Sequence, residues 1–210
     1  MGKLDLIARV EARVHAPATE APKRDGWPAV AAATDEYRRV TATGDWLGDR
    51  TTLVQALTEL GGGYWVLTPL RGRDGATVLV NRGFVPPEKR DPAGWRPLDP
   101  GPVTVTGLLR MTEPRGGFLR SNDPGADRWH SRDVAAIAAA RGLEDVAPYF
   151  IDAEREPNAA GYPVAGLTVI AFANNHLVYA LTWFALAAMA AAGAIYLNAD
   201  VLRRRATVDL

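Results

Sequence analysis

The feature that most constrains this chain is an uncharged segment near its C-terminus, residues 177–197. As a helix it would be about 32 Å long at roughly 1.5 Å per residue, enough to cross a hydrocarbon core of about 30 Å. A helix packed on a soluble core normally keeps a polar face, and this segment has none. Tyr179, Trp183 and Tyr196 lie near its two ends, as in the aromatic belts of membrane proteins. With its capping asparagines, the sequence predicts a transmembrane helix over residues 174–197.

The charges around this helix predict its orientation. Arg203, Arg204 and Arg205 follow it, whereas residues 158–176 contain neither Lys nor Arg. By the positive-inside rule, the tail (198–210) is then cytoplasmic. The domain before the helix is expected on the periplasmic side of the cytoplasmic (inner) membrane.

The N-terminal residues do not explain how that domain is exported. They read MGKLDLIARVEARVHAP, which is polar and amphipathic and matches neither a signal peptide nor a span. Residues 3–14 have helical spacing, and a linker rich in Pro and Ala continues to residue 26. Either a first membrane helix lies upstream of Met1, or the C-terminal anchor translocates everything before it. We expect the former.

Composition narrows the classes of function. The 210 residues suit one folded domain and an anchor, and 24 basic against 24 acidic residues give no field for binding nucleic acid. The chain has no cysteine, which excludes disulfides, thiolate metal sites, iron–sulfur clusters and a cysteine nucleophile. It also lacks the motifs of serine hydrolases, P-loop proteins, zinc proteases and dinucleotide-binding enzymes. Familiar catalytic motifs therefore assign no reaction to the chain.

The region between the linker and the membrane helix, residues 27–173, is dominated by hairpin signals. The glycine run at 61–63 predicts a turn, and RDG at 73–75 predicts a tight hairpin connection. The strand-like segments are residues 36–43, 51–57 (which also fits a short helix), 64–70, 76–85, 103–111, 149–153 and 167–172. Because regular strand–helix alternation is absent, we expect an antiparallel, barrel-like α+β domain.

The best helical pattern in this domain covers residues 130–143, with Ser131 as the expected N-cap and Gly142 at the end. The preceding loop and first turn contain four side chains that can bind a metal or act as a base: Asp123, Asp127, His130 and Asp133. The plainer interpretation is a polar loop that leads into a capped helix.

His176 lies at the outer end of the predicted span. Tyr179 and Trp183, at i+3 and i+7, fall on the same helical face. Ionisable groups at membrane depth face protein or ligand, because exposure to lipid is costly. Neutral imidazole is a common axial ligand of haem iron, and flat aromatic neighbours can line a porphyrin. His176 is therefore either a haem ligand or an interfacial histidine bonded to headgroups or to the periplasmic domain.

Several motifs occur together along nearly the whole chain. They are LVNRGFVP (79–86), GPVTVTGLLR (101–110), NDP (122–124) with Trp129 following, YFIDA (149–153) and NNHLVYALTWFALA (174–187). In this order they resemble the Surfeit locus protein 1 family of membrane assembly factors for haem–copper cytochrome c oxidase. The resemblance implies two membrane helices that flank an extracytoplasmic domain, of which this chain contains the second helix.

The resemblance also implies a cofactor, haem a. His176 matches the histidine that the family associates with haem a, so it becomes the expected metal ligand. Tyr179 and Trp183 would shape the pocket. Arg82, in the NRGF sequence, would either pair with a haem propionate or make a structural ion pair or strand-end hydrogen bond.

The implied role is to receive or present haem a while the catalytic subunit of the oxidase is built. Such a protein makes or breaks no bond in a substrate, so the resemblance implies that it is not an enzyme. The expected partners are oxidase subunits, the machinery that supplies haem a, and the lipid bilayer. One alternative is an assembly scaffold that contacts oxidase subunits without binding haem. Another is a membrane-anchored hydrolase that uses Asp123, His130 and Asp133.

Overall fold

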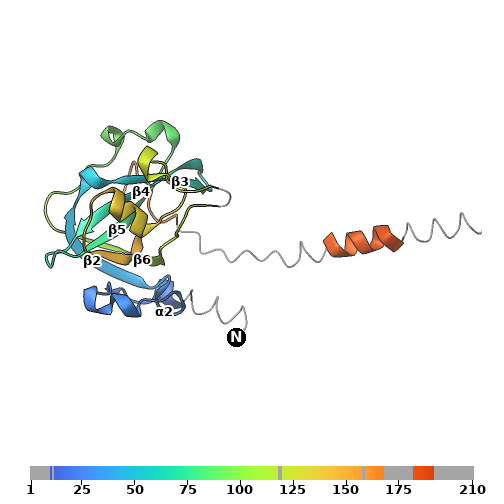
Figure 1. The fold of residues 1–210 in the computed structure, drawn as a ribbon, viewed down its shortest axis with the longest axis horizontal. Coiled ribbons are helices and arrows are strands. Elements are labelled where there is room, and N and C mark those ends of the chain that lie inside the picture. Colours follow the sequence, from blue (N-terminus) through green and yellow to red (C-terminus); the bar gives the residue numbers. More distant parts are fainter. Residues whose placement is uncertain (1–9, 11, 118–119, 158, 168–181, 192–210) are drawn as a thin grey trace, which may run out of the picture. The chain divides into compact units, whose positions relative to one another are not determined.

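The computed structural model describes residues 10, 12–117, 120–157, 159–167 and 182–191 (Figure 1). The chain divides into two compact units, Met1–Val169 and Ile170–Leu210. Each unit is described here by itself.

The first unit is built around a closed β-sheet (Figure 1). Its strands are β1 (Thr19–Glu20), β2 (Arg39–Trp46), β3 (Thr52–Thr58), β4 (Gly61–Arg71), β5 (Thr77–Val85), β6 (Val103–Met111) and β7 (Val146–Ala153). Their order is β1-β2-β6-β7-β5-β4-β3, and a further pairing of β2 with β4 closes the five central strands into a barrel. The expected barrel-like fold is confirmed with one correction. The sheet is mixed, because β1 pairs with β2, and β5 with β7, in parallel.

Helices in this unit are few and short. The α-helices with defined bounds are α2 (Ala32–Asp35) and α3 (Val134–Ala140), and residues 12–15 are also helical. The 3-10 helices are η1 (Arg24–Ala29), η2 (Gly48–Arg50), η3 (Pro87–Lys89), η4 (Pro92–Gly94) and η5 (Pro124–Ala126). Of the helix expected over residues 3–14, residues 10 and 12–14 are described and helical. The others lie outside the described part of the chain.

Three local predictions from the sequence are confirmed. The alternating segment 103–111 coincides with β6. The RDG connection joins β4 to β5, which pair antiparallel, and Gly75 takes the positive φ of 82° that this turn needs. The ambiguous segment 51–57 is β3, a strand.

The glycine run at 61–63 is not the turn that the sequence predicts. It begins β4, and the turn before it consists of Glu59 and Leu60. Gly63 is required by packing, because a Cβ there would lie 2.3 Å from the Val85 carbonyl oxygen and 2.6 Å from the Phe84 ring. Gly63 therefore lets β4 lie close against β5.

The helix expected over 130–143 is also shorter than its pattern suggests. α3 covers Val134–Ala140, and its N-cap is Asp133, which accepts a hydrogen bond from the Ala136 N–H at 3.2 Å. The prediction that Ser131 caps it is wrong, because the Ser131 hydroxyl donates instead to the Glu113 carbonyl at 2.7 Å. A carboxylate nearer the first turn satisfies the free N–H groups at the positive helix end better than a distant hydroxyl.

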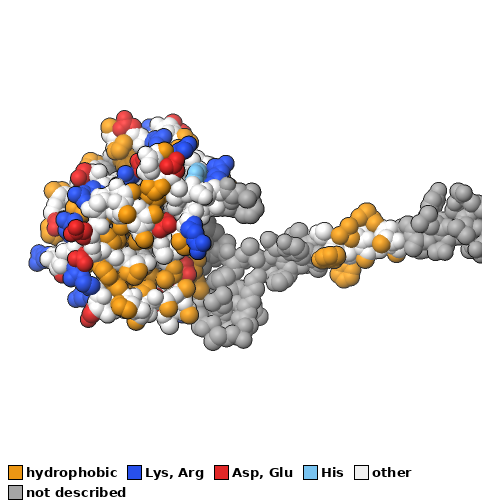
Figure 2. Space-filling view, in the orientation of Figure 1, with side chains coloured by type: hydrophobic (Ala, Val, Ile, Leu, Met, Phe, Trp, Pro, Cys, Tyr) orange, Lys and Arg blue, Asp and Glu red, His pale blue; other side chains and the backbone are white. Residues whose placement is uncertain are grey.

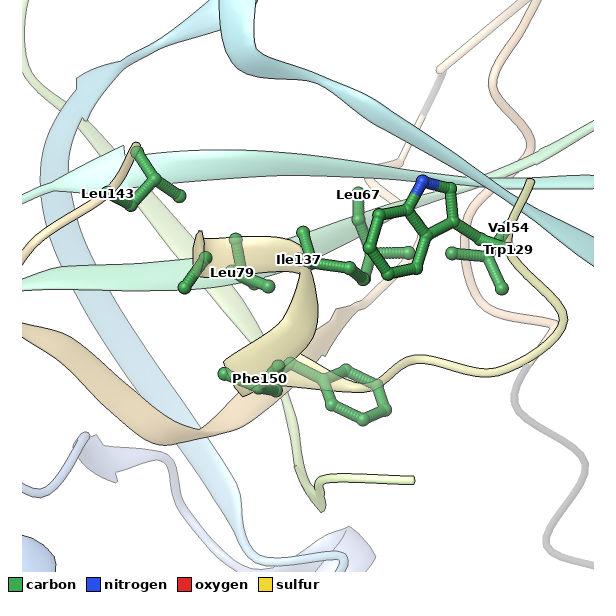
Figure 3. Close-up of a cluster of buried hydrophobic side chains, with 9 residues drawn as sticks. Val54, Leu67, Leu79, Trp129, Ile137, Leu143 and Phe150 are labelled. Atoms are coloured by element: carbon green, nitrogen blue, oxygen red, sulfur yellow. The ribbon is translucent and has the colours of Figure 1, made fainter. Parts of the chain in front are cut away.

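Two hydrophobic clusters lie on opposite faces of the sheet. The first fills the space between the sheet and α3 (Figure 3) and consists of Val54, Leu67, Leu79, Trp129, Val134, Ile137, Ala138, Leu143 and Phe150. The second takes residues from all five barrel strands and therefore fills the barrel: Val40, Leu70, Val78, Val80, Leu109, Ala147, Tyr149 and Ile151. Alternate residues of β5 enter the two clusters in turn, as the period of a strand requires.

In the second unit the structure describes residues 182–191, which form a helix (Figure 1). Among the described residues, no helix combines the length and the apolar character needed to cross a membrane. The rest of the span expected over 174–197, with Tyr196, lies outside them. So do the strand expected over 167–172 beyond Leu167 and the tail with Arg203, Arg204 and Arg205.

Candidate functional site

The four residues that the sequence predicts to hold a cofactor fall in different parts of the chain. Arg82 lies on β5 in the first unit, and Trp183 lies on the helix of the second. His176 and Tyr179 lie outside the described residues. Their assignment as a haem ligand and a pocket wall therefore stays a prediction.

Trp183 belongs to a helix without charged side chains. Trp183 is 70% exposed, Phe184 74%, Leu186 47% and Met189 63%. Figure 2 shows this segment as a hydrophobic surface, whereas acidic and basic side chains are scattered over the barrel. Each large apolar side chain left in water forgoes about 1.5–3 kcal/mol of burial. Side chains of this kind are stabilised by apolar surroundings.

Arg82 is a buried cation with few partners. The residue is 9% exposed, and its Nη2 donates a hydrogen bond to the Arg96 carbonyl oxygen at 3.2 Å. Its guanidinium lies over the Trp46 ring, 5.7 Å from the centroid. Among the described residues, no carboxylate lies within ion-pair distance of Arg82, whereas Arg96 pairs with Glu156 at 3.8 Å. The structure thus provides the strand-end hydrogen bond considered for Arg82, but not the structural ion pair.

The electrostatic setting of Arg82 follows from this geometry. Burial, and then the positive charge of Arg96, lower the pKa of Arg82 to about 10, while Asp99 and Glu156 act in the opposite direction. The guanidinium stays charged at neutral pH. Because it has five N–H donors, it retains several that can bind a carboxylate or phosphate through charge-assisted hydrogen bonds.

A second polar group, centred on Asp152, lies on the other face of the sheet. Asp152 is 3% exposed and accepts hydrogen bonds from Asn81 Nδ2 at 2.8 Å, Arg110 Nη1 at 2.9 Å and Arg132 Nη1 at 3.1 Å. Asn81 is its register partner across the parallel β5–β7 pair. One buried carboxylate therefore joins two strands and two arginines.

Arg132 extends this group to Glu113. Its Nε and Nη2 bond the two oxygens of the Glu113 carboxylate, and its guanidinium stacks 4.6 Å from the Phe150 ring centroid. Burial alone would lower the pKa of Arg132, but Asp152 and Glu113 outweigh it and raise the pKa above its ordinary value. For the Glu113 carboxyl, burial acts in the opposite sense and would raise the pKa. The hydrogen bond and the charge of Arg132 outweigh burial, so the pKa of Glu113 is lowered. Arg132 and Glu113 therefore both stay ionised at neutral pH and act as structural links.

The NRGF sequence, residues 81–84, runs from the polar group around Asp152 to the end of β5. Asn81 Oδ1 accepts a hydrogen bond from the Gly83 N–H at 3.1 Å. Gly83 has φ of 127°, and a Cβ there would lie 2.3 Å from the Val164 carbonyl oxygen. Phe84 is buried, and its backbone exchanges two hydrogen bonds of 2.9 Å with Val164. Asn81, Gly83 and Phe84 thus each have a structural task.

The four side chains proposed as a metal or base site all have partners within the protein. Asp123 pairs with Arg128, Asp127 with Arg141, His130 with Gln55, and Asp133 caps α3. Asp127 also accepts from the Trp129 indole at 2.7 Å, which fixes the largest side chain of the first cluster. In the part of the chain that the structure describes, no group of His, Asp and Glu side chains is arranged to hold a metal. The interpretation as a polar loop before a capped helix is the one that the geometry supports.

Sequence reasoning missed the group around Asp152, although a signal was present. Asn81, Arg110 and Asp152 each interrupt a run of apolar residues within a predicted strand. A polar residue at such a position is costly to bury unless it is paired. The pattern therefore indicates buried pairing, but it does not identify the partners, which come from separate strands.

Comparison with known proteins adds to this geometry. A model of the SURF1 family matches residues 2–188. The chain is 35% identical to "Surfeit locus protein 1" of Homo sapiens over 204 residues, which cover 89% of this chain and 66% of the human protein. It is 33% identical to the protein of the same name in Mus musculus over 203 residues, covering 89% and 64% of the two chains. It is 31% identical to a "SURF1-like protein" of Caenorhabditis elegans, covering 88% and 62%. The chain thus spans slightly less than two thirds of the length of these relatives.

Proposed function

Because the chain belongs to the SURF1 family, we propose that it is a membrane-anchored assembly factor for haem–copper cytochrome c oxidase that handles haem a through His176. The observation that carries this proposal is the family match over residues 2–188, since this range contains all four predicted site residues. In this role the protein binds and positions a cofactor for another protein. It makes or breaks no bond in a substrate.

Haem a would supply an iron centre whose axial position a neutral imidazole can occupy. The part of this chain is to offer that imidazole, from His176, just before the uncharged run 177–197 of the sequence. Tyr179 and Trp183 would cover one side of the macrocycle. The exposure of Trp183 on a helix without charges fits a wall for an apolar ligand.

Arg82 is the proposed contact for a propionate of the haem. Its lack of a carboxylate partner among the described residues supports this assignment. Its hydrogen bond to the Arg96 carbonyl supports the competing interpretation, a structural role at the end of β5. The two interpretations differ in what the removal of the guanidinium does to stability.

The proposed location is the cytoplasmic (inner) membrane, with the barrel on the periplasmic side and residues 198–210 in the cytoplasm. The uncharged run 177–197 and the arginines that follow it support this arrangement. The proposed partners are the catalytic subunit of the oxidase, the machinery that supplies haem a, and the bilayer.

The alternative is a scaffold that contacts oxidase subunits without binding haem, in which His176 would be replaceable. The hydrolase alternative has less support. Asp123 pairs with Arg128, His130 bonds Gln55 and Asp133 caps α3, whereas a general base must be free to take a proton.

Genetic complementation tests the proposal. In cells that lack this gene, the haem a content and oxidase activity of the membranes should fall, and the wild-type chain and a His15→Ala variant should restore both. His15 is exposed and serves as the matched control. His176→Ala should restore neither. Full restoration by His176→Ala would favour the scaffold, and unchanged oxidase in the deletion strain would contradict any role in its assembly.

A further inference from the structure

The turn between β3 and β4 exposes two leucines. Leu57 is 87% exposed and Leu60 is 54% exposed, and in the described part of the barrel unit they are the large hydrophobic side chains with this degree of exposure. Leu57 pairs across the hairpin with Gly62, so no cross-strand side chain covers it. A Cβ at Gly61 or Gly62 would meet nothing within 4 Å. The hairpin tip, residues 57–62, therefore projects from the barrel with its leucines uncovered.

The turn holds this apolar tip in one conformation. The Thr58 hydroxyl accepts a hydrogen bond from the Leu60 N–H at 3.1 Å and donates one to the Gly61 carbonyl at 3.3 Å. Gly61 takes a φ of 98°, which a side chain would oppose. Local bonds thus keep Leu60 turned outward rather than folded back on the barrel.

Two arginines contact the hairpin two residue pairs behind Leu57, on the same face as Leu57. Gln55 and Tyr64 form that pair. Arg120 Nη1 donates to Gln55 Oε1 at 3.3 Å, and the Arg90 guanidinium lies over the Tyr64 ring, 5.2 Å from its centroid. Neither arginine has a carboxylate within ion-pair distance among the described residues. The acidic side chain at the tip is Glu59, which is exposed.

The hairpin tip lies at the same end of the barrel as Val164, near the last described residues of this unit. A Cβ on Gly63 would meet the Phe84 ring, and Phe84 in turn is bridged to Val164. Leu167 is the last described residue of this unit, and the sequence then runs on to His176 and the uncharged stretch. The exposed leucines and the last described residues of this unit therefore lie at neighbouring strand ends.

We propose that the hairpin tip rests on the lipid bilayer, with Leu57 and Leu60 at the boundary of headgroups and acyl chains and with Arg90 and Arg120 beside lipid phosphates. This inference rests on the proposed membrane anchoring. An apolar tip with cations behind it is the arrangement that binds an anionic membrane surface, because burial and charge then act at adjacent depths. The contact would fix the orientation of the barrel relative to the membrane.

The absence of cysteine from the chain makes a direct test simple. The full chain with Leu57→Cys, labelled with an environment-sensitive fluorophore, is reconstituted into phosphatidylcholine–phosphatidylglycerol vesicles that contain a nitroxide-labelled lipid. Arg73→Cys is the matched control, because Arg73 is exposed in the turn at the other end of β4. We expect several-fold stronger quenching at position 57 than at 73, and weaker quenching at 57 when phosphatidylglycerol is left out.

Flotation of the same samples separates the two proposals. The protein could float with the vesicles while the labels at positions 57 and 73 are quenched equally. That result would overturn the contact of the hairpin tip and leave the proposed membrane anchoring intact. A protein that does not float would overturn both. Repeating the measurement with Leu60→Cys guards against a local effect at one site. A third outcome is that position 57 is not quenched in vesicles of lipid alone and becomes protected only when oxidase is added. This outcome would assign the tip to a protein partner and overturn the lipid contact.

Discussion

Asn81 and Asp152 are joined by a 2.8 Å hydrogen bond across the parallel β5–β7 pair. This bond links the NRGF and YFIDA motifs, which lie 71 residues apart in the sequence. Arg110 and Arg132 bond the same carboxylate, so β6 and the loop before α3 are held to the same point. The two motifs are therefore parts of one buried structural group.

Asp152→Asn should be strongly destabilising. It removes the shared anion and leaves the guanidiniums of Arg110 and Arg132, both largely buried, without their common partner. Breaking a buried ion pair in this way costs about 3–5 kcal/mol. The free energy of unfolding in urea measures the loss. Asp123→Asn, which affects a surface pair with Arg128, should change the free energy of unfolding far less, because solvent screens an exposed ion pair. Similar losses in both variants would contradict the structural role of Asp152.

Gly83→Ala should also lower the free energy of unfolding, for a backbone reason. The φ of 127° is unfavourable for alanine, and the added methyl would meet the Val164 carbonyl oxygen. We expect a loss of at least about 1–3 kcal/mol. Gly94→Ala is the control, since a Cβ there meets nothing within 4 Å and φ is not positive. Equal stability of Gly83→Ala and wild type would show that this close approach is not required.

The lowered pKa of Glu113 predicts a loss of stability in acid. A carboxyl group whose folded-state pKa is depressed stabilises the protein above its ordinary pKa, here 4.5, and loses that contribution as the pH falls through the folded-state value. Unfolding free energy measured from neutral pH downward should therefore fall below about pH 4.5. Glu113→Gln should start from a lower stability and show a shallower fall. Parallel curves for the two proteins would rule out this contribution.

Arg82→Met distinguishes the two roles of Arg82. If the guanidinium is kept for a ligand, its replacement by an apolar side chain of similar length should change the unfolding free energy by less than about 1 kcal/mol, since a buried cation is costly to keep. The variant should nevertheless restore less oxidase activity than wild type. Arg132→Met is the comparison, and it should cost several times more because Arg132 has two carboxylate partners. A large loss of stability in Arg82→Met would make Arg82 structural.

Local patterns predicted the strands well. Alternation in VTVTGLLRM gave the bounds of β6, and turn residues gave the β4–β5 hairpin. The parallel β5–β7 pairing and the closure through β2 and β4 were not predictable from such patterns, because they join segments far apart in the chain. Helix capping was predicted at Ser131 but occurs at Asp133, where competition from the Glu113 carbonyl for Ser131 decides the outcome.

For the candidate site too, the sequence predicted single residues but not their partners. The sequence marked Arg82 and the carboxylates near His130 as chemically interesting, but not their partners. The carboxylates proved to be committed to arginines and helix ends, and Arg82 proved to lack a carboxylate among the described residues. These differences come from three-dimensional neighbours, which residue type and spacing alone do not specify.

The most direct test of the central proposal is a visible absorption spectrum of the full-length protein purified from cells that make haem a. Wild type, His176→Ala and His15→Ala are compared at matched expression. The proposal predicts a haem a spectrum in wild type and His15→Ala and its loss in His176→Ala. An absence of haem from all three, with haem a present in the membranes, would contradict haem handling by this protein. An equal spectrum in all three would contradict the assignment of His176 as the ligand.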